Sequence, residues 1–253
     1  MRPIDASELL DLSEYETARP RMQARVIELK RRRRVPVGRY LSFVFENRET
    51  VQFQIQEMCR VERIVDPEKI AEEVEVYNSL IPGPGELSAT MMIEIEDREQ
   101  IQPILDKLMG IDARDYVRLQ VGAEAIPGVF EAGHSDEERG KISAVHFVRF
   151  PLTESARRAF RAADVWLIVD HPNEHARTRL SVPRAARGAP APRWLPARLH
   201  AQARLGADVA DAAARVVHPR PRRLPRRRVK TVPPGSAVGP RRCSPPASGE
   251  ASN

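Results

Sequence analysis

The sequence predicts an α+β protein in which N-terminal helices pack on a ferredoxin-like sheet with one extra strand, and a disordered tail follows. From Glu86 onward, period-two and helical runs alternate in the order strand, helix, strand, strand, strand, helix, strand, which is close to a split βαβ arrangement. The composition then changes near Leu180. Residues 1–180 contain 26 Lys and Arg against 32 Asp and Glu, whereas residues 181–253 contain 15 against 3. The basic charge of the chain therefore belongs to its last part.

The N-terminal region is expected to begin with a long helix. Ser13 and Glu16 have the spacing of a capping box, and apolar residues recur every three or four positions from Tyr15. Pro20 is expected to kink or restart this helix. The helix ends in the basic run 30–34, which is either a solvated helix terminus or a contact for an anion or RNA.

Four further segments complete the first half. Residues 35–45 read as a strand with a turn or bulge at Gly38, and Asn47 is expected to cap a helix that runs to about Ile64. Asp66 and Pro67 start another helix, and the Pro-Gly-Pro-Gly sequence at 82–85 ends it.

The second half is expected to alternate strands with two short helices. Strands are predicted at 87–95, 116–121, 125–131, 141–150 and 165–170, and helices at 101–108 and 153–160. The strands 116–121 and 125–131 should form a hairpin.

The tail, residues 181–253, has no Ile, Phe, Tyr or Met and holds 12 of the 22 prolines. Such a composition buries too little apolar surface to offset the backbone entropy of folding, about 1–2 kcal/mol per residue, so we expect disorder. The Arg, Pro, Ala and Gly bias suggests a frameshifted extension that begins near Pro183. The competing interpretation is a genuine basic arm, because the run 220–230 could neutralise phosphates.

Several protein classes are disfavoured for residues 1–180. No signal peptide and no apolar stretch of membrane-spanning length is found, and Cys59 is the only cysteine before the tail. A disulfide framework and a cysteine-ligated metal site are therefore not expected, and a cytoplasmic protein is the default expectation.

Separate blocks of sequence resemble the DUF3501 family, a bacterial family without an assigned activity. The blocks are Phe45 to Met58, Arg60 to Ile64, Tyr77 to Pro82, Gly85 to Thr90, Ser143 to Phe150 and Asp170 to Pro172. The resemblance covers about residues 5–180, and the chain departs from the family after that point.

The resemblance implies a redox setting, because genes of this family are often found near those of rubrerythrin-like and iron–sulfur oxidoreductase proteins. We therefore expect a binding or accessory factor with such proteins as partners. An enzyme with a carboxylate and histidine site, with or without assistance by a metal, is the alternative. Nucleic-acid binding through the basic segments is the third interpretation.

The candidate ligand site centres on the helix after Asn47. Gln52, Gln56 and Arg60 are spaced four residues apart and so lie along one ridge, where they can form a ladder or hold a polar ligand. A helix N-terminus can receive an anion. The full candidate set is Glu46, Asn47, Arg48, Gln52, Gln56, Glu57, Arg60, Glu94 and His146.

No catalytic residue, metal ligand set or cofactor is assigned from the sequence. Cys59 lies in an apolar helical stripe, which indicates an inert core thiol. No nucleophile elbow, phosphate loop or dinucleotide fingerprint is found, and no Glu-x-x-His spacing on a predicted helix supports a di-iron site.

Overall fold

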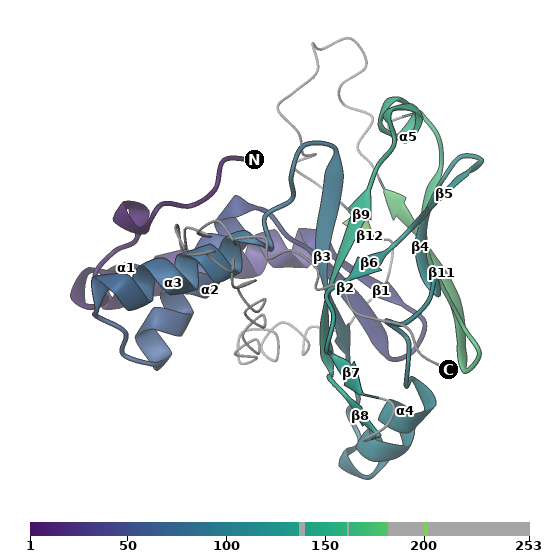
Figure 1. Cartoon of the computed structure of the whole chain (residues 1–253), viewed down its shortest axis with the longest axis horizontal. Coiled ribbons are helices and arrows are strands. Elements are labelled where there is room, and N and C mark those ends of the chain that lie inside the picture. The colour runs from purple at the N-terminus through teal and green to yellow at the C-terminus, as the bar shows by residue number, and fades with distance from the viewer. Residues whose placement is uncertain (137–139, 161, 182–199, 202–253) are drawn as a thin grey trace, which may run out of the picture. The chain divides into compact units, whose positions relative to one another are not determined.

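A computed structural model describes residues 1–136, 140–160, 162–181 and 200–201. It contains two five-stranded antiparallel sheets, with a layer of helices on one of them (Figure 1). The first sheet has the strand order β1 (Arg34–Val37), β2 (Leu41–Phe45), β3 (Glu86–Ile93), β9 (Val145–Pro151), β6 (Val129–Phe130). The second has the order β12 (His200–Ala201), β11 (Glu174–Ser181), β10 (Val165–His171), β4 (Val117–Val121), β5 (Glu124–Pro127).

The remaining elements are short except for three helices. They are the 3-10 turns η1 (Ala6–Glu8) and η2 (Arg98–Gln100), the helices α1 (Leu12–Arg33), α2 (Arg48–Val61), α3 (Pro67–Asn78), α4 (Ile101–Lys107) and α5 (Glu154–Ala159), and the hairpin β7 (Ser135–Asp136) with β8 (Lys141–Ile142). No helix in the described ranges is long and apolar enough to cross a membrane.

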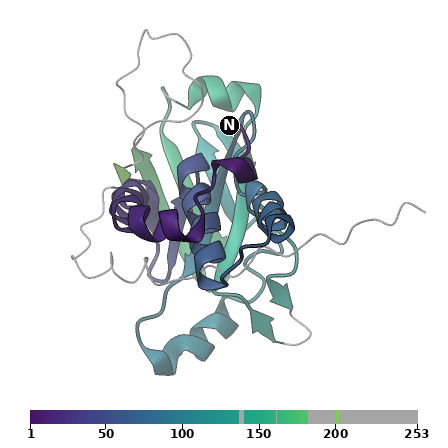
Figure 2. The ribbon, with the colours of Figure 1, turned by 90° about the vertical axis from the view of Figure 1, so that its left-hand side faces the viewer.

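The alternation of β3 explains why the first sheet is covered on both faces. Leu87, Ala89 and Met91 point into an apolar core between the two sheets, which the second sheet lines with residues such as Leu119 and Leu167. Met92 points the other way, into a second core shared with α2 and α3. Figure 2, viewed from the helix side, shows α1, α2 and α3 lying over this face.

The two sheets are joined at both edges. On one side the hydroxyl group of Thr178 in β11 donates to the carbonyl oxygen of Pro36 in β1 at 2.6 Å. On the other side β5 belongs to the second sheet and β6 to the first, with only Gly128 between them. The amide of Gly128 donates to the carbonyl oxygen of Val117 at 2.8 Å, so the chain changes sheets at this residue.

The ferredoxin-like prediction is not supported, although the α+β class is confirmed. All strand pairs in the described residues are antiparallel, and the strands are divided between two sheets. A ferredoxin-like arrangement would place the predicted strands in one sheet, with a third strand between two strands that a helix connects. Instead β10, which follows α5, pairs with β4 and with β11, and β11 was not predicted from the sequence.

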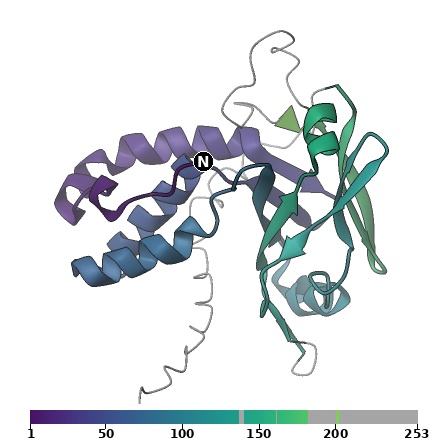
Figure 3. The same ribbon diagram turned by 45° about the horizontal axis from the view of Figure 1, so that its top comes forward.

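Helix starts were predicted with mixed success. Asn47 and Asp66 cap α2 and α3 as expected, but the capping box of α1 is formed by Asp11 and Glu14, two residues earlier than predicted. Pro20 does not restart α1, which is continuous and leads directly into β1 (Figure 3). The expectation of a disordered tail falls almost entirely outside the described residues.

Candidate functional site

The helix α2 begins at a buried acidic position. Its N-cap Asn47 accepts from the amide of Thr50 at 2.8 Å, and the hydroxyl group of Thr50 accepts from the amide of Asn47 at 2.9 Å. The preceding residue, Glu46, is 1% exposed and points from the end of β2 to the helix side of the sheet. Its carboxylate accepts hydrogen bonds from the hydroxyl groups of Thr90, at 2.7 Å, and Thr50. Asn47 is thus a structural cap.

The buried guanidinium of Arg33 binds the main chain next to this carboxylate. It donates to the carbonyl oxygens of Phe45, at 2.6 Å, and Glu46, at 2.9 Å. Burial lowers the pKa of Arg33 to about 10, and the nearby charge of Glu46 acts in the opposite direction. The group therefore stays charged at neutral pH and secures the junction of β2 with α2.

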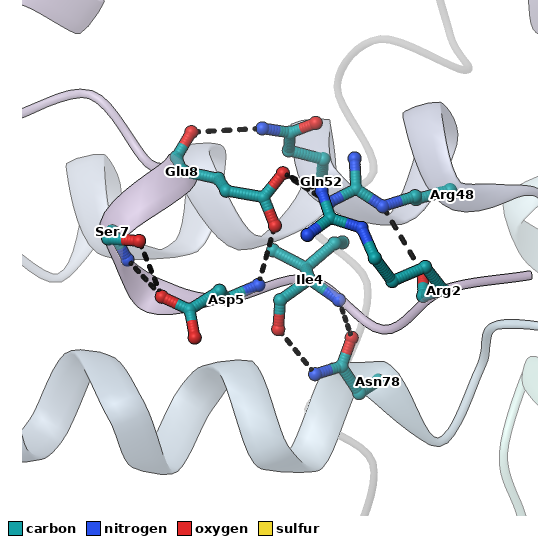
Figure 4. Close-up of polar contacts among 8 residues, drawn as sticks. All are labelled: Arg2, Ile4, Asp5, Ser7, Glu8, Arg48, Gln52 and Asn78. Atoms are coloured by element: carbon teal, nitrogen blue, oxygen red, sulfur yellow. Dashed lines mark hydrogen bonds and ion pairs between the residues drawn. The ribbon is translucent and has the colours of Figure 1, made fainter.

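Arg48 and Gln52 hold a stretch of the protein's own chain, the N-terminal segment (residues 2–10), which includes the 3-10 turn η1, as Figure 4 shows. Arg48 donates to the carbonyl oxygen of Arg2 at 3.2 Å and pairs with the carboxylate of Glu8 at 2.5 Å. Gln52 donates to the carbonyl oxygen of Glu8 at 3.1 Å. The predicted ridge thus contacts polypeptide main chain.

Two side-chain amides hold both polar groups of one residue in this segment. Gln56 accepts from the amide of Leu10 at 2.7 Å and donates to its carbonyl oxygen at 3.1 Å. Asn78 of α3 does the same for Ile4, at 2.8 and 2.9 Å (Figure 4). The side chain of Ile4 is buried in the apolar core between α2, α3 and the first sheet. These contacts engage main-chain groups on either side of the turn η1 and, Ile4 apart, depend little on the sequence of the segment.

The far end of the ridge carries a charge network instead. Glu57 accepts from the hydroxyl group of Tyr15 at 2.6 Å and from two nitrogens of Arg19 at 2.7 and 3.0 Å, while Arg60 lies 3.4 Å away. Burial would raise the pKa of Glu57, but the hydrogen bonds from Arg19 and Tyr15 outweigh it and hold the pKa below its ordinary value. Glu57 is thus an ionised carboxylate that joins α1 to α2.

The basic run 30–34 is largely neutralised within the described structure. Arg31 and Arg32 pair with Glu28, Arg33 is buried, and Arg34 pairs with Glu94. Arg31, whose side chain is 72% exposed, shares the single carboxylate of Glu28 with Arg32, so part of the positive charge of the run stays at the surface. Glu94 follows β3 and pairs with Arg34 at the start of β1, so it lies apart from the α2 ridge.

His146 lies in the core between the sheets, not with the other candidates. Its ring is 0% exposed, and Nε2 is 2.8 Å from the carbonyl oxygen of Ser143. Nδ1 lies 3.5 Å from Oδ2 of Asp112, which follows α4. The ring of His134 is close by, with its centroid 5.5 Å from that of His146.

The nine predicted residues thus fall into separate sets of contacts. Arg48, Gln52 and Gln56 act together on the N-terminal segment, and Glu57 acts with Arg60. Sequence reasoning missed the partners that give these residues their roles, namely Asn78, Tyr15, Arg19, Asp112 and His134. Each of these comes from a distant part of the chain or from an irregular segment, so no local spacing could have indicated them.

The cysteine of the described residues lies in a core. Cys59 is a buried thiol in the core shared by α2, α3 and the first sheet, as the sequence predicted. Among the residues that the structure describes, no group of three or more His, Cys, Asp or Glu side chains lies in an arrangement that could hold a metal ion.

Comparisons with known proteins agree with the extent of the folded part. The DUF3501 family, described as proteins of unknown function, matches residues 3–188. A crystal structure of a novel protein of unknown function from Burkholderia pseudomallei K96243 is 33% identical, with a TM-score of 0.66. The match covers 71% of this chain and 94% of that one. No curated protein matches the chain.

Proposed function

Because the chain belongs to the DUF3501 family, whose members have no known function, its role must be argued from geometry, and we propose that it is a binding or accessory factor. Its contact surface is the helical layer with the N-terminal segment laid on it. The observation that carries this proposal is the pair of amide contacts that Gln56 and Asn78 make with Leu10 and Ile4.

These contacts hold the N-terminal segment in one conformation before any partner arrives. The cost of ordering the segment is then met during folding, which leaves more of the interaction free energy for binding. Several side chains remain available to a partner: the side chain of Arg2 is 71% exposed, and Leu10, Val61 and Val65 are exposed apolar residues at or near the ends of the segment and of α2. A mixed apolar and charged surface of this kind suits another protein.

The proposed partners are redox proteins of the rubrerythrin-like and iron–sulfur oxidoreductase classes. Support for them comes from the gene neighbourhood that the family resemblance implies, which is an association and not a contact. The proposed contact surface comes from the structure, and the candidate partner proteins come from the gene neighbourhood.

The test is retention of these partner proteins by the immobilised full chain. Deletion of residues 2–10, or the double variant Gln56→Ala with Asn78→Ala, should weaken retention at least tenfold, because the segment loses its fixed conformation. The control is Gln102→Ala, which removes an exposed amide from α4 and should retain partners like the unchanged protein. Failure of the unchanged protein to retain any of these partners, or equal retention by the deletion variant, would contradict the proposal.

An enzyme with a carboxylate and histidine site is the second candidate. The placement of His146 opposite Asp112 favours it, because a histidine with a buried carboxylate partner is a common element of acid–base and metal sites. Both side chains are almost fully buried, so the pair needs a ligand of small size.

A further inference from the structure

Three buried polar atoms lie at one end of the core between the sheets, where Figure 1 places α4, β7 and β8. They are Oδ1 of Asp112, Nε2 of His134 and Nδ1 of His146, and none has a hydrogen-bond partner in the described part of the chain. The side chains are 8%, 7% and 0% exposed. Buried polar atoms without partners are costly, so this group calls for a ligand.

The orientation of His146 identifies the charge of that ligand. A carbonyl oxygen only accepts, so the contact with Ser143 places the hydrogen on Nε2. In a neutral ring Nδ1 then presents its lone pair to the carboxylate of Asp112. Two electron-rich atoms that face each other need a cation between them.

The separations favour a metal ion over a shared proton. A charged N–H···O bond is about 2.7–2.9 Å long, whereas Nδ1 and Oδ2 are 3.5 Å apart. A tetrahedral zinc ion with bonds of about 2.0–2.2 Å places two of its donor atoms roughly 3.3–3.6 Å apart, and the centres of two imidazole ligands roughly 5–5.5 Å apart. The rings of His134 and His146 are 5.5 Å apart.

The surroundings of His146 have a second feature of metal sites. A metal-ligating histidine almost always donates its other ring N–H to a carboxylate or a main-chain carbonyl, which fixes the ring. The contact between Nε2 and Ser143 does this and leaves Nδ1 for the metal.

We propose that Asp112, His134 and His146 bind one divalent transition-metal ion of the zinc type. Two nitrogen donors and one carboxylate suit such an ion better than magnesium or calcium, which prefer oxygen alone. In the described ranges no three of these side chains are placed so that they could hold a metal ion together, so the proposal requires the ring of His134 to turn its Nε2 toward Asp112 and His146. A water molecule or Glu131, whose carboxylate is 3.8 Å from Nε2 of His134, supplies the fourth ligand.

The experiment is a zinc titration of the full chain after metal has been removed with a chelator, read by competition with a chromophoric chelator. Cobalt(II) serves as a second probe, because its visible absorption reports tetrahedral nitrogen and oxygen coordination. We expect one ion per chain. Asp112→Asn and His134→Ala should each weaken zinc binding at least tenfold. His175→Ala, which removes an exposed histidine from β11, should bind like the unchanged protein.

Thermal unfolding separates a loss of zinc binding from a loss of stability in the variants. Zinc should raise the melting temperature of the unchanged protein and of His175→Ala, but not that of Asp112→Asn or His134→Ala, whatever their starting values. Absence of zinc binding, or equal binding by all four proteins, would overturn the proposal. Binding is read without any activity, so a bound ion with no reaction would refute only the enzyme candidate.

Discussion

The hydroxyl group of Tyr15 donates a hydrogen bond of 2.6 Å to the carboxylate of Glu57, and so ties the buried face of α1 to α2. Arg19 binds the same carboxylate with two nitrogens. Both donors favour the charged form of Glu57, which makes this contact dependent on pH.

We predict that Glu57 contributes to stability at neutral pH and that this contribution disappears in acid. Its folded-state pKa is lowered by the hydrogen bonds that outweigh burial, so the contribution is complete above the unfolded value of about 4.3 and is lost as the pH falls through the folded value. Urea unfolding should show a difference in unfolding free energy between the protein and Glu57→Gln that is constant from pH 6 to 7. The difference should shrink as the pH falls below the unfolded pKa of about 4.3. A difference that does not change with pH would argue against this role.

Gly128 should resist substitution because the chain changes sheets there. A Cβ atom at this position would lie 2.8 Å from a methyl group of Val148 and 3.1 Å from the carbonyl oxygen of Val117. Gly128→Ala is therefore expected to lower the free energy of unfolding by about 1–3 kcal/mol, the usual cost of overpacking. Gly83→Ala is the control, because there the nearest atom is the flexible end of Glu86, and its unfolding should change much less.

Thr90 should matter because its hydroxyl group satisfies a buried carboxylate. Thr90→Val keeps the shape of the side chain but leaves Glu46 with one donor fewer, and it should cost about 1–3 kcal/mol of unfolding free energy. Thr17→Val, on the exposed side of α1, should cost much less. Equal losses in the two variants would show that the carboxylate does not depend on Thr90.

Nucleic-acid affinity, if the full chain has any, should reside after residue 188, where the family match ends. The arginines of the run 31–34 are paired or buried, whereas 181–253 carries 15 basic residues against 3 acidic ones. A chain that ends at 188 should lose salt-dependent binding to a mixed-sequence oligonucleotide in a fluorescence anisotropy titration. Retained affinity would place the contact within residues 1–188.

The frameshift hypothesis is tested by the coding DNA, which either shows or lacks an alternative reading frame that continues a helix.

The sequence was most informative where a local rule decides the structure. Asn47 and the Asp66-Pro67 pair cap helices because their side chains and ring geometry act within three residues. The alternation from Leu87 also predicted a strand correctly, because one face of β3 meets the second sheet and the other meets the helices.

Prediction from the sequence failed where contacts between distant parts of the chain decide the structure. The pairing of β10 with β4 and β11 depends on which apolar faces fit together, and the same order of elements is compatible with more than one sheet. The run from Glu174 to Ser181 does alternate, but its arginines resemble the composition of the tail, and this obscured β11. Helical spacing identified Gln52 and Gln56 as a polar contact surface. It could not show that this surface binds residues 2–10 of the same chain.

The central claim is that the polar row of α2, together with Asn78, fixes the N-terminal segment by its main chain. Hydrogen exchange of the amides of Ile4 and Leu10 measures this directly, because their only described acceptors are the side-chain oxygens of Asn78 and Gln56. Both amides should be protected in the unchanged protein and in Gln102→Ala, and Asn78→Ala and Gln56→Ala should each expose the amide they bind. Rapid exchange of both amides in the unchanged protein would contradict the claim.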